Sequence, residues 1–249
     1  MPERKLYTAR LLRDSMLSER AQCKHLEFAV EDTADFAFIA GQFVSTVARD
    51  ANGKAQTRAY SVASGPKGSN RFDLCLNRVE NGFFSNYLCD LKANDTVQFH
   101  GPHGLFILRN PLRDCVMIAT GTGIAPMRGF VEWLFDSAQP RHEGKQIYLV
   151  YGTRLESEIY YREYFEQVAA GNPNFHYIVT LSRADESWQG QRGYVQDRVK
   201  AVLEPRADRG KGSMDAYICG LNLMVSANRK QLQEDFGWEK KQVIFERYD

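Results

Sequence analysis

Residues suited to holding a phosphate group occupy the segment Ala119–Phe130, which reads ATGTGIAPMRGF. Gly121, Thr122 and Gly123 form a glycine turn after an apolar run, and Pro126 follows near the start of a predicted helix. Glycines let the backbone approach a ligand closely, and the free N–H groups of a helix start attract anions. The segment predicts a nucleotide phosphate site. Pro126 stands where the full dinucleotide fingerprint has its third glycine, and a purely structural turn is the alternative.

A second candidate site is the segment Arg58–Ser64, which reads RAYSVAS. In a strand, Arg58 and Tyr60 lie on one face. An arginine offers a fork of donors to a pyrophosphate, and a tyrosine ring can stack on the ring system of a flavin. Ser61 points to the other face and reaches the same ligand only if the strand bends. Taken alone, the pattern is better explained as an ordinary strand with an exposed arginine.

Further downstream, ENGFFSNYL places Gly82 before a predicted helix and Ser85 in its first turn. The unpaired N–H groups of that turn suit the other end of a pyrophosphate. Simple capping of the helix explains the same residues about as well.

The segment Leu181–Asp197 suits the adenosine end of a nucleotide. It contains two arginines, a hydroxyl and an aromatic ring, which fit a ribose 2′-phosphate and a stacked adenine: Ser182, Arg183, Arg192 and Tyr194. An NAD site would use an acidic residue on the free 2′-hydroxyl, and Asp185 and Glu186 lie nearby. A solvated polar loop is the remaining alternative.

Neither a metal site nor a nucleophilic cysteine is predicted. The five histidines have no ligand spacing, and the five cysteines form no CxxC pair. Cys219 ends the apolar run DAYIC and has no activating histidine nearby in the sequence. It is interpreted as a small buried residue or as a residue that lines a nicotinamide pocket.

The bulk composition of the 249 residues is that of a globular protein, with 43% hydrophobic and 25% charged residues. A net charge of +1 gives no overall field that favours nucleic acid or an anionic membrane. The odd cysteine count favours a reducing compartment. No secretory h-region and no run of about 18 apolar residues occurs. We therefore expect a cytoplasmic protein without a membrane span.

Two kinds of element must position these residues. Up to about residue 110, short β-branched and aromatic runs separated by Gly, Asn, Asp and Pro predict a small antiparallel barrel, interrupted by a helix over 83–91. From Cys115 onward, strands alternate with helices, which predicts a parallel sheet flanked by helices. With a linker over 109–114, the domains are expected at 1–110 and 111–249.

Taken together, the motifs resemble those of the ferredoxin–NADP reductase family, and its plant-type branch most. The resemblance runs from about Leu6 to Tyr248 and follows the family's order: RAYSVAS, GFFSNYLCDL, GTGIAP, SRADESWQGQRGYVQ, YICGL and FERY. It implies a two-domain fold, with an N-terminal six-stranded antiparallel FAD-binding β-barrel and a C-terminal α/β domain that binds NADP(H).

The resemblance also assigns roles to individual residues. Arg58, Tyr60, Ser61 and Ser85 would bind FAD, with Tyr60 stacked on one face of the flavin. Ser182, Arg183, Arg192 and Tyr194 would hold the adenosine end of NADP. The catalytic group would be Ser61, Cys219, Glu246 and Tyr248: Ser61 near the reactive ring nitrogen, Cys219 beside the nicotinamide, Glu246 ordering protons, and Tyr248 covering the second flavin face.

The implied activity is electron transfer between NADP(H) and a one-electron carrier through FAD. The carrier would be an acidic ferredoxin or flavodoxin, docked near Lys67, Lys92 and Arg109, and the enzyme would be a monomer. Alternatives are a free flavin reductase, the reductase of an oxygenase, or a non-catalytic flavin-binding electron-transfer subunit.

Two departures from the plant-type pattern stand out. Asp249 follows the tyrosine with which those members end, and a carboxylate there would alter nicotinamide entry. The segment between RFDLCLNRV and ENGFFS is also shorter than in plant-type members, where a longer insertion helps to hold the adenine of FAD. FMN therefore remains an alternative to FAD.

Overall fold

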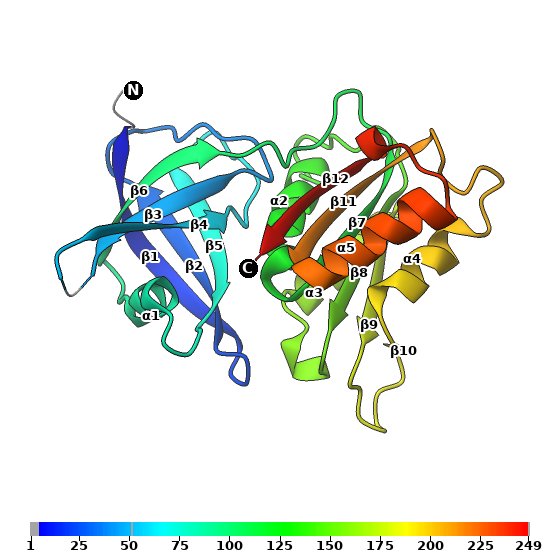
Figure 1. Ribbon diagram of the computed structural model, residues 1–249. Coiled ribbons are helices and arrows are strands. Elements are labelled where there is room, and N and C mark those ends of the chain that lie inside the picture. Colours follow the sequence, from blue (N-terminus) through cyan, green and yellow to red (C-terminus); the bar gives the residue numbers. More distant parts are fainter. Residues whose placement is uncertain (1–4, 51, 249) are drawn as a thin grey trace. The chain divides into compact units, whose positions relative to one another are not determined.

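The computed structural model describes residues 5–50 and 52–248 (Figure 1). Asp249, and with it any effect of its carboxylate, lies outside the described residues. The chain divides into two compact units, each described by itself below. The first is Met1–Ile107 with Arg128–Trp133, and the second is Leu108–Met127 with Leu134–Asp249.

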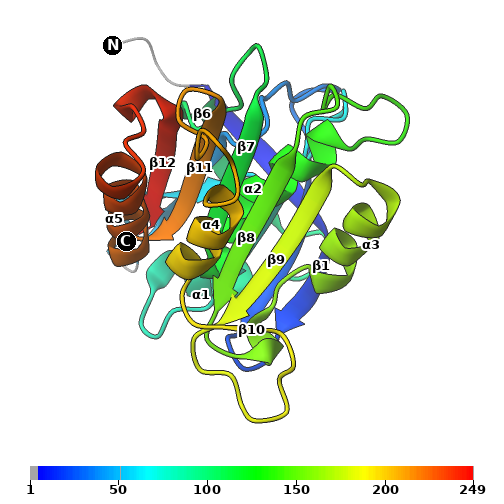
Figure 2. The same ribbon diagram turned by 90° about the vertical axis from the view of Figure 1, so that its right-hand side faces the viewer.

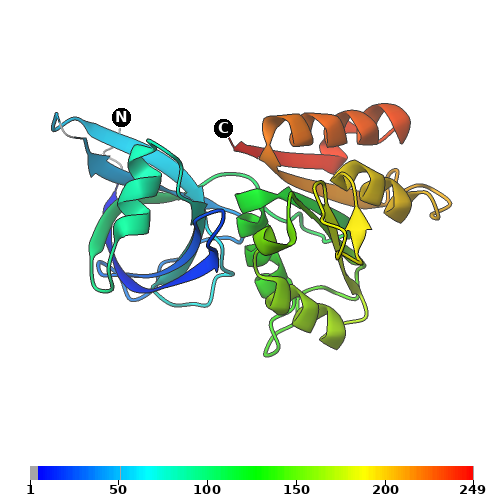
Figure 3. The ribbon, with the colours of Figure 1, turned by 90° about the horizontal axis from the view of Figure 1, so that it is seen from below.

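The first unit is a six-stranded antiparallel sheet in the order β4-β3-β6-β1-β2-β5. Its strands are β1 (Leu6–Ser18), β2 (Cys23–Val30), β3 (Phe43–Arg49), β4 (Ala55–Ser61), β5 (Arg71–Asn77) and β6 (Thr96–His103). Just past the end of β4, a β-bridge joins Val62 to Leu74 of β5 and brings the two ends of the sheet together. Figure 3 shows these strands curving around a common interior, as a barrel requires.

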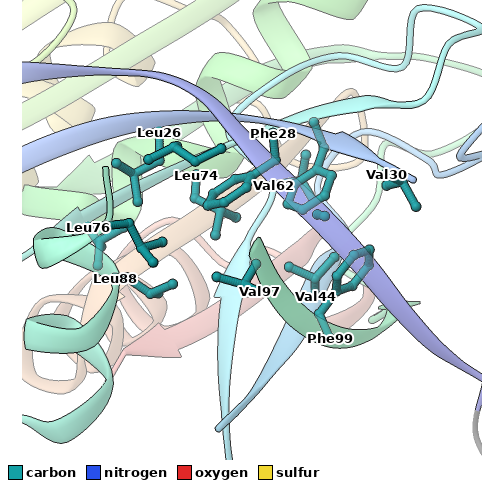
Figure 4. Close-up of a cluster of buried hydrophobic side chains, with 14 of the residues drawn as sticks. Leu26, Phe28, Val30, Val44, Val62, Leu74, Leu76, Leu88, Val97 and Phe99 are labelled. Carbon is teal, nitrogen blue, oxygen red and sulfur yellow. The ribbon is translucent and has the colours of Figure 1, made fainter. Parts of the chain in front are cut away.

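The interior of the barrel is filled by side chains from alternate strand positions. In β2, Leu26, Phe28 and Val30 are all fully buried, as the period of two demands. They pack with Leu74 and Phe99 in the cluster drawn in Figure 4. Fully burying side chains of this kind is worth about 1.5–3 kcal/mol each, so this cluster is a main source of stability for the unit.

Helix α1 (Phe83–Asp90) is the single α-helix that lies wholly within the described part of the first unit. Leu88 and Cys89 on its inner face belong to the barrel cluster. This packing fixes the helix against the sheet, and its first turn is one of the candidate phosphate-binding positions.

The second unit contains a parallel sheet in the order β10-β9-β8-β7-β11-β12 (Figure 2). Its strands are β7 (Asp114–Thr120), β8 (Ile147–Thr153), β9 (Phe175–Leu181), β10 (Gln191–Arg192), β11 (Met214–Leu221) and β12 (Val243–Tyr248). The central strands are buried on both faces, which explains their continuous apolar sequences.

The helices that follow these strands are α2 (Ile124–Leu134), α3 (Arg162–Gly171), α4 (Val195–Leu203) and α5 (Asn222–Lys230). Helices α4 and α5 pack on one face of the sheet, where they share a cluster with Ile118 and Ile218. On the other face, Phe165 of α3 contacts the ring of Tyr177 in β9. Figure 3 shows α3 and α5 on opposite sides of the sheet.

Shorter helical turns complete the second unit. They are η1 (Gly121–Gly123), η2 (Glu156–Glu158), the π-helical turn η3 (Gln231–Asp235) and η4 (Lys240–Gln242). Helix α5 thus continues directly into the π turn η3, and α2 ends at Leu134.

None of the helices in residues 5–50 and 52–248 is long and apolar enough to cross a membrane. All five cysteines are buried and none forms a disulfide.

Candidate functional site

Strand β4 presents an open edge of the first sheet. It pairs along its length with β3, where Arg58 lies opposite Thr46 and Tyr60 opposite Val44. The side chains are exposed up to Ala59, Tyr60 is half-buried, and Ser61 is buried. Burial raises the pKa of Tyr60 to about 12, against the opposing charge of Arg58, so this phenol is neutral at pH 7 and can donate a hydrogen bond.

The last turn of α1 lies near this strand, since the pKa of Tyr60 also responds to Cys89 and the Tyr60 ring packs on the cluster that contains it. The Ser85 hydroxyl accepts a hydrogen bond from the Val79 N–H at 3.0 Å and donates to the Gly82 carbonyl at 3.3 Å. A side chain at Gly82 would lie 2.6 Å from this hydroxyl, so close packing explains the glycine.

The Ser85 hydroxyl therefore holds the turn before α1 together, and no side chain among the described residues caps the start of the helix. The first N–H to bond back to the helix start is that of Asn86, which donates to the Gly82 carbonyl. The N–H groups of the three preceding helix residues lie outside the helical ladder and are available to an anion.

In the second unit, the glycine turn packs directly against β11. A Cβ atom on Gly123 would lie 2.2 Å from the carbonyl oxygen of Cys219, so only glycine fits there. Gly121 has a φ of +53°, and its carbonyl accepts a hydrogen bond from the Tyr151 hydroxyl at 3.1 Å. Thr122 is half-buried in the turn.

Pro126 lies in the first turn of α2, where its missing N–H costs no helical hydrogen bond. The turn and the helix start have the geometry expected of a phosphate-binding element.

Cys219, Glu246 and Tyr248 come together on neighbouring strands. Cys219 lies opposite Glu246 in the pairing of β11 with β12, and Leu221 lies opposite Tyr248. Burial raises the pKa of the Cys219 thiol well above its ordinary value, and the Glu246 carboxylate raises it further, whereas a hydrogen bond with Tyr248 acts the other way. The thiol is therefore neutral at physiological pH and suits a wall of the site rather than a nucleophile.

At the adenosine segment, Arg192 has a structural role. Its guanidinium group donates to the carbonyls of Ala184 at 3.1 Å, Asp185 at 2.6 Å and Trp188 at 2.9 Å. It therefore holds the loop after β9 in shape. Tyr194, at the start of α4, is 69% exposed and available for stacking.

Ser182 and Arg183 directly follow β9, and both side chains are exposed. Their N–H groups donate to the carbonyls of Thr153 and Arg154 at 3.0 and 2.9 Å, so Arg154 is a second cationic residue beside Arg183. Arg154 was not among the expected residues, and its position just after the strand run of β8 is the signal that marks it. Asp185 accepts hydrogen bonds from Ser187, which lower the pKa of its carboxyl group, so it is engaged within the loop.

The predicted residues thus form two sets. In the first unit, Arg58, Tyr60 and Ser61 are on β4, while Gly82 and Ser85 mark the start of α1. In the second unit, the nucleotide-site candidates gather where the parallel strands end, the edge at which such sheets bind ligands: Thr122, Gly123, Pro126, Ser182, Arg183, Arg192, Tyr194, Cys219, Glu246 and Tyr248.

Two family models match this chain. Residues 9–107 match an oxidoreductase FAD-binding domain, and residues 117–230 match an oxidoreductase NAD-binding domain. The chain is 39% identical over 229 residues to "Ferredoxin--NADP reductase B" of Sorangium cellulosum (strain So ce56), with 91% of each protein covered. The chain belongs to the ferredoxin reductase family.

Two further proteins are similar to this chain at lower identity. The reductase component DmpP of phenol 2-monooxygenase from Pseudomonas sp. (strain CF600) is 33% identical over 85% of this chain, which spans 58% of that protein. The crystal structure of the Amycolatopsis cytochrome P450 reductase GcoB has the same fold, with a TM-score of 0.82 and 24% identity over 98% of this chain and 69% of that one.

These findings confirm the expected family and the two-domain fold of an antiparallel FAD-binding barrel and an α/β nucleotide-binding domain. The protein is a flavin-dependent oxidoreductase, with FAD rather than FMN as the cofactor that its first domain indicates. The roles of the individual site residues stay predictions.

Proposed function

We propose that the protein is a ferredoxin–NADP(+) reductase, which transfers electrons between NADP(H) and an acidic one-electron carrier such as ferredoxin or flavodoxin. The observation that carries the proposal is the 39% identity to a ferredoxin–NADP reductase over nine tenths of both chains. The relatives that serve oxygenases match over 58–60% of their own length. A monomer in the cytoplasm is the form in which we expect it to act.

The residues of the first unit fit a flavin cofactor. Arg58 and Tyr60 share a face of the edge strand β4, and the N–H groups at the start of α1 offer a second position for an anion in the same unit. Arg58 would bind the pyrophosphate, and the Tyr60 ring would stack on the flavin. Bound FAD supplies the redox chemistry, because it accepts electrons in pairs from a nicotinamide and releases them singly.

The residues of the second unit fit a nicotinamide nucleotide. The turn at Gly121–Gly123 would hold the pyrophosphate on backbone N–H groups, and the absence of a side chain at Gly123 keeps it packed on β11. Cys219 would offer a neutral, buried wall to the nicotinamide. Tyr248 would occupy the position into which the nicotinamide moves, and Glu246 would order protons beside it.

A preference for NADP(H) over NAD(H) rests on the exposed arginines at the strand ends. Arg183 and Arg154 adjoin each other through a backbone hydrogen bond, and together they suit the 2′-phosphate. Asp185, the acidic residue that would serve a free 2′-hydroxyl in an NAD site, accepts hydrogen bonds from Ser187 instead.

The carrier would dock on a basic surface. Of the three expected basic residues, Lys67 forms an ion pair with Glu132 at 2.6 Å and Arg109 with Asp215 at 3.6 Å. Their charges are partly compensated, so Lys92 is the better remaining candidate among them.

Anaerobic titration of the FAD-loaded protein with NADPH tests the proposal, followed by steady-state assays with reduced or oxidised ferredoxin and with free flavin. Bleaching of the bound flavin and efficient turnover with ferredoxin are expected. Turnover with free flavin but not with ferredoxin would favour a flavin reductase. A flavin that stays oxidised would indicate a non-catalytic subunit.

A further inference from the structure

A buried ionic cluster lies beside the end of β4 and, apart from Lys67 at its surface, belongs to none of the sites above. We call it the Arg128 cluster, and it consists of Arg128, Asp73, Glu132, His25 and Lys67. All five residues belong to the first unit. The side chains of Arg128 and Asp73 are each 14% exposed, and that of Glu132 is 19% exposed. Charges buried to this degree are costly unless they are paired, so the cluster calls for an explanation.

The cluster holds the loop that directly follows Ser61. The Arg128 guanidinium donates through Nη1 to the carbonyl of Ala63 at 2.5 Å and to Asp73 Oδ2 at 3.1 Å. The Gly65 N–H donates to Glu132 Oε2 at 2.8 Å.

Asp73 holds the same loop through its backbone. Its N–H donates to the Ser64 hydroxyl at 3.0 Å, and its carbonyl accepts from the Ala63 N–H at 2.7 Å. Each residue of Ala63–Gly65 is therefore fixed by Asp73, Arg128 or Glu132.

The packing beneath these bonds is backbone against backbone. A Cβ atom on Gly129 would lie 2.9 Å from the Ser64 carbonyl oxygen, and one on Gly65 would lie 3.0 Å from the Trp133 nitrogen. The loop can shift little without separating from the Arg128–Trp133 segment, so the ionic contacts act on a closely fitted surface.

The charges of the cluster balance around Arg128. Burial lowers the pKa of His25 to about 4, with the charge of Arg128 acting in the same direction, so this imidazole is neutral at pH 7. Arg128 therefore faces two carboxylates, Asp73 and Glu132, and Lys67 pairs with the second of them at the surface. Without Arg128, two carboxylates would lie close together and the Ala63 carbonyl would lose its donor.

We propose that Arg128 is a positioning residue for the flavin, because it fixes the Ala63–Gly65 loop and through it the end of the strand that carries Tyr60 and Ser61. The inference rests on the proposed role of β4 as the flavin strand. Arg128 acts through the backbone of the loop and does not itself contact the cofactor.

The test compares the full-length chain with its Arg128→Met and Arg128→Lys variants. Hydrogen exchange of the apo-proteins is measured first. We expect the Gly65 amide of Arg128→Met to exchange about tenfold faster, while the Leu11 amide, which donates to Asp95 elsewhere in the barrel, keeps its wild-type rate. A uniform acceleration at both amides would mean general destabilisation and would overturn the positioning role.

The second readout is the flavin itself. In Arg128→Met, the dissociation constant of FAD should rise about tenfold. The visible circular dichroism of the bound flavin should change, and kcat should fall with little change in KM for NADPH. Arg128→Lys keeps the charge and a donor, so it should restore part of each effect. Arg206→Met, which removes a half-buried ion pair with Asp114 in the second unit, is the matched control and should leave FAD binding unchanged.

If Arg128→Met does not fold, Asp73→Asn replaces it, since that change keeps the shape of the cluster and removes one charge. Unaltered FAD affinity, dichroism and Gly65 exchange in the variants that fold would disprove the inference. Failure of the proposed function has a different signature, because the wild-type protein itself would then not bind FAD or not be reduced by NADPH. In that case, hydrogen exchange of the apo-protein still tests whether Arg128 holds the Ala63–Gly65 loop.

Discussion

The α-carbon of Gly123 lies so close to the carbonyl oxygen of Cys219 that an added methyl group would be 2.2 Å from it. The nucleotide turn and β11 are thereby fitted together without a side chain between them. This contact links the position of the turn to that of the residue proposed to line the nicotinamide pocket.

Replacing Gly123 by Ala should therefore displace the turn. Because the obstacle is backbone, relief requires a main-chain shift, which costs about 1–3 kcal/mol in well-packed regions. We expect a lower thermal midpoint and weaker NADPH binding by calorimetry. Gly121→Ala is the control, since nothing lies within 4 Å of its added Cβ and only its φ of +53° opposes the change. Equal effects of the two substitutions would contradict the packing argument.

Tyr248→Ser should raise the affinity for both NAD(H) and NADP(H), because it removes the ring proposed to occupy the nicotinamide position. An aromatic stacking contact of ~0.5–1.5 kcal/mol corresponds to a gain of about two- to tenfold. Difference spectroscopy of the oxidised protein with NADP measures it. Tyr248→Phe keeps the ring and removes the hydrogen bond to Cys219, so its affinity should stay near that of the wild type. An unchanged affinity in the serine variant would argue against the role of the ring.

The two arginines of the adenosine segment should differ in their effects. Arg183→Ala should weaken NADPH binding about ten- to hundredfold and leave NADH nearly unaffected, because a charged hydrogen bond to the 2′-phosphate contributes about 1.5–3 kcal/mol. Arg192→Ala removes three bonds that shape the loop, so both nucleotides should bind more weakly. Dissociation constants for NADPH and NADH decide the matter. A loss of NADH affinity in Arg183→Ala equal to that of NADPH would remove the 2′-phosphate assignment.

His25 should make the first unit less stable in mild acid. Its pKa is about 4 in the folded protein and 6.5 when unfolded, so between these values the unfolded chain binds the additional proton. The contribution of His25 to the free energy of unfolding does not change above pH 6.5. It falls as the pH drops toward 4, and the full loss is about 3 kcal/mol or less. Urea unfolding between pH 7.5 and 4.5 measures the slope. In the His25→Gln variant, the free energy of unfolding should depend less steeply on pH in this range. Asp73 and the other carboxylates titrate in both proteins, so they contribute equally to the two slopes. Identical slopes would refute the low pKa of His25.

Much of this fold can be read from the sequence, because its strands are short and apolar and its helices are regular. Strand β1 has little sequence signal of its own, since charged residues such as Arg10, Arg13 and Asp14 interrupt its apolar pattern. The two-residue β10 carries no periodic signal at all. Both depend on pairing with other strands, β1 with β2 and β6, and β10 with β9.

The candidate sites likewise contain some features that the sequence indicates and others that it does not. Glycine turns and motif order predict the nucleotide-binding segments, because those depend on local backbone requirements. The Arg128 cluster joins residues 55 positions apart, as in the pair of Arg128 with Asp73, and no local pattern indicates such a contact. The structural role of Arg192 was equally hidden, since its partners are carbonyl groups, which any sequence provides.

The loop that Arg192 supports is shaped by the protein's own carbonyls. In the proposed site, the shape of the loop and the preference for one coenzyme therefore depend on different side chains. If Arg183 and Arg154 bind the 2′-phosphate as proposed, cofactor preference can be changed at these two positions while the loop keeps its shape. A reductase built in this manner can exchange one coenzyme pool for another through very few substitutions.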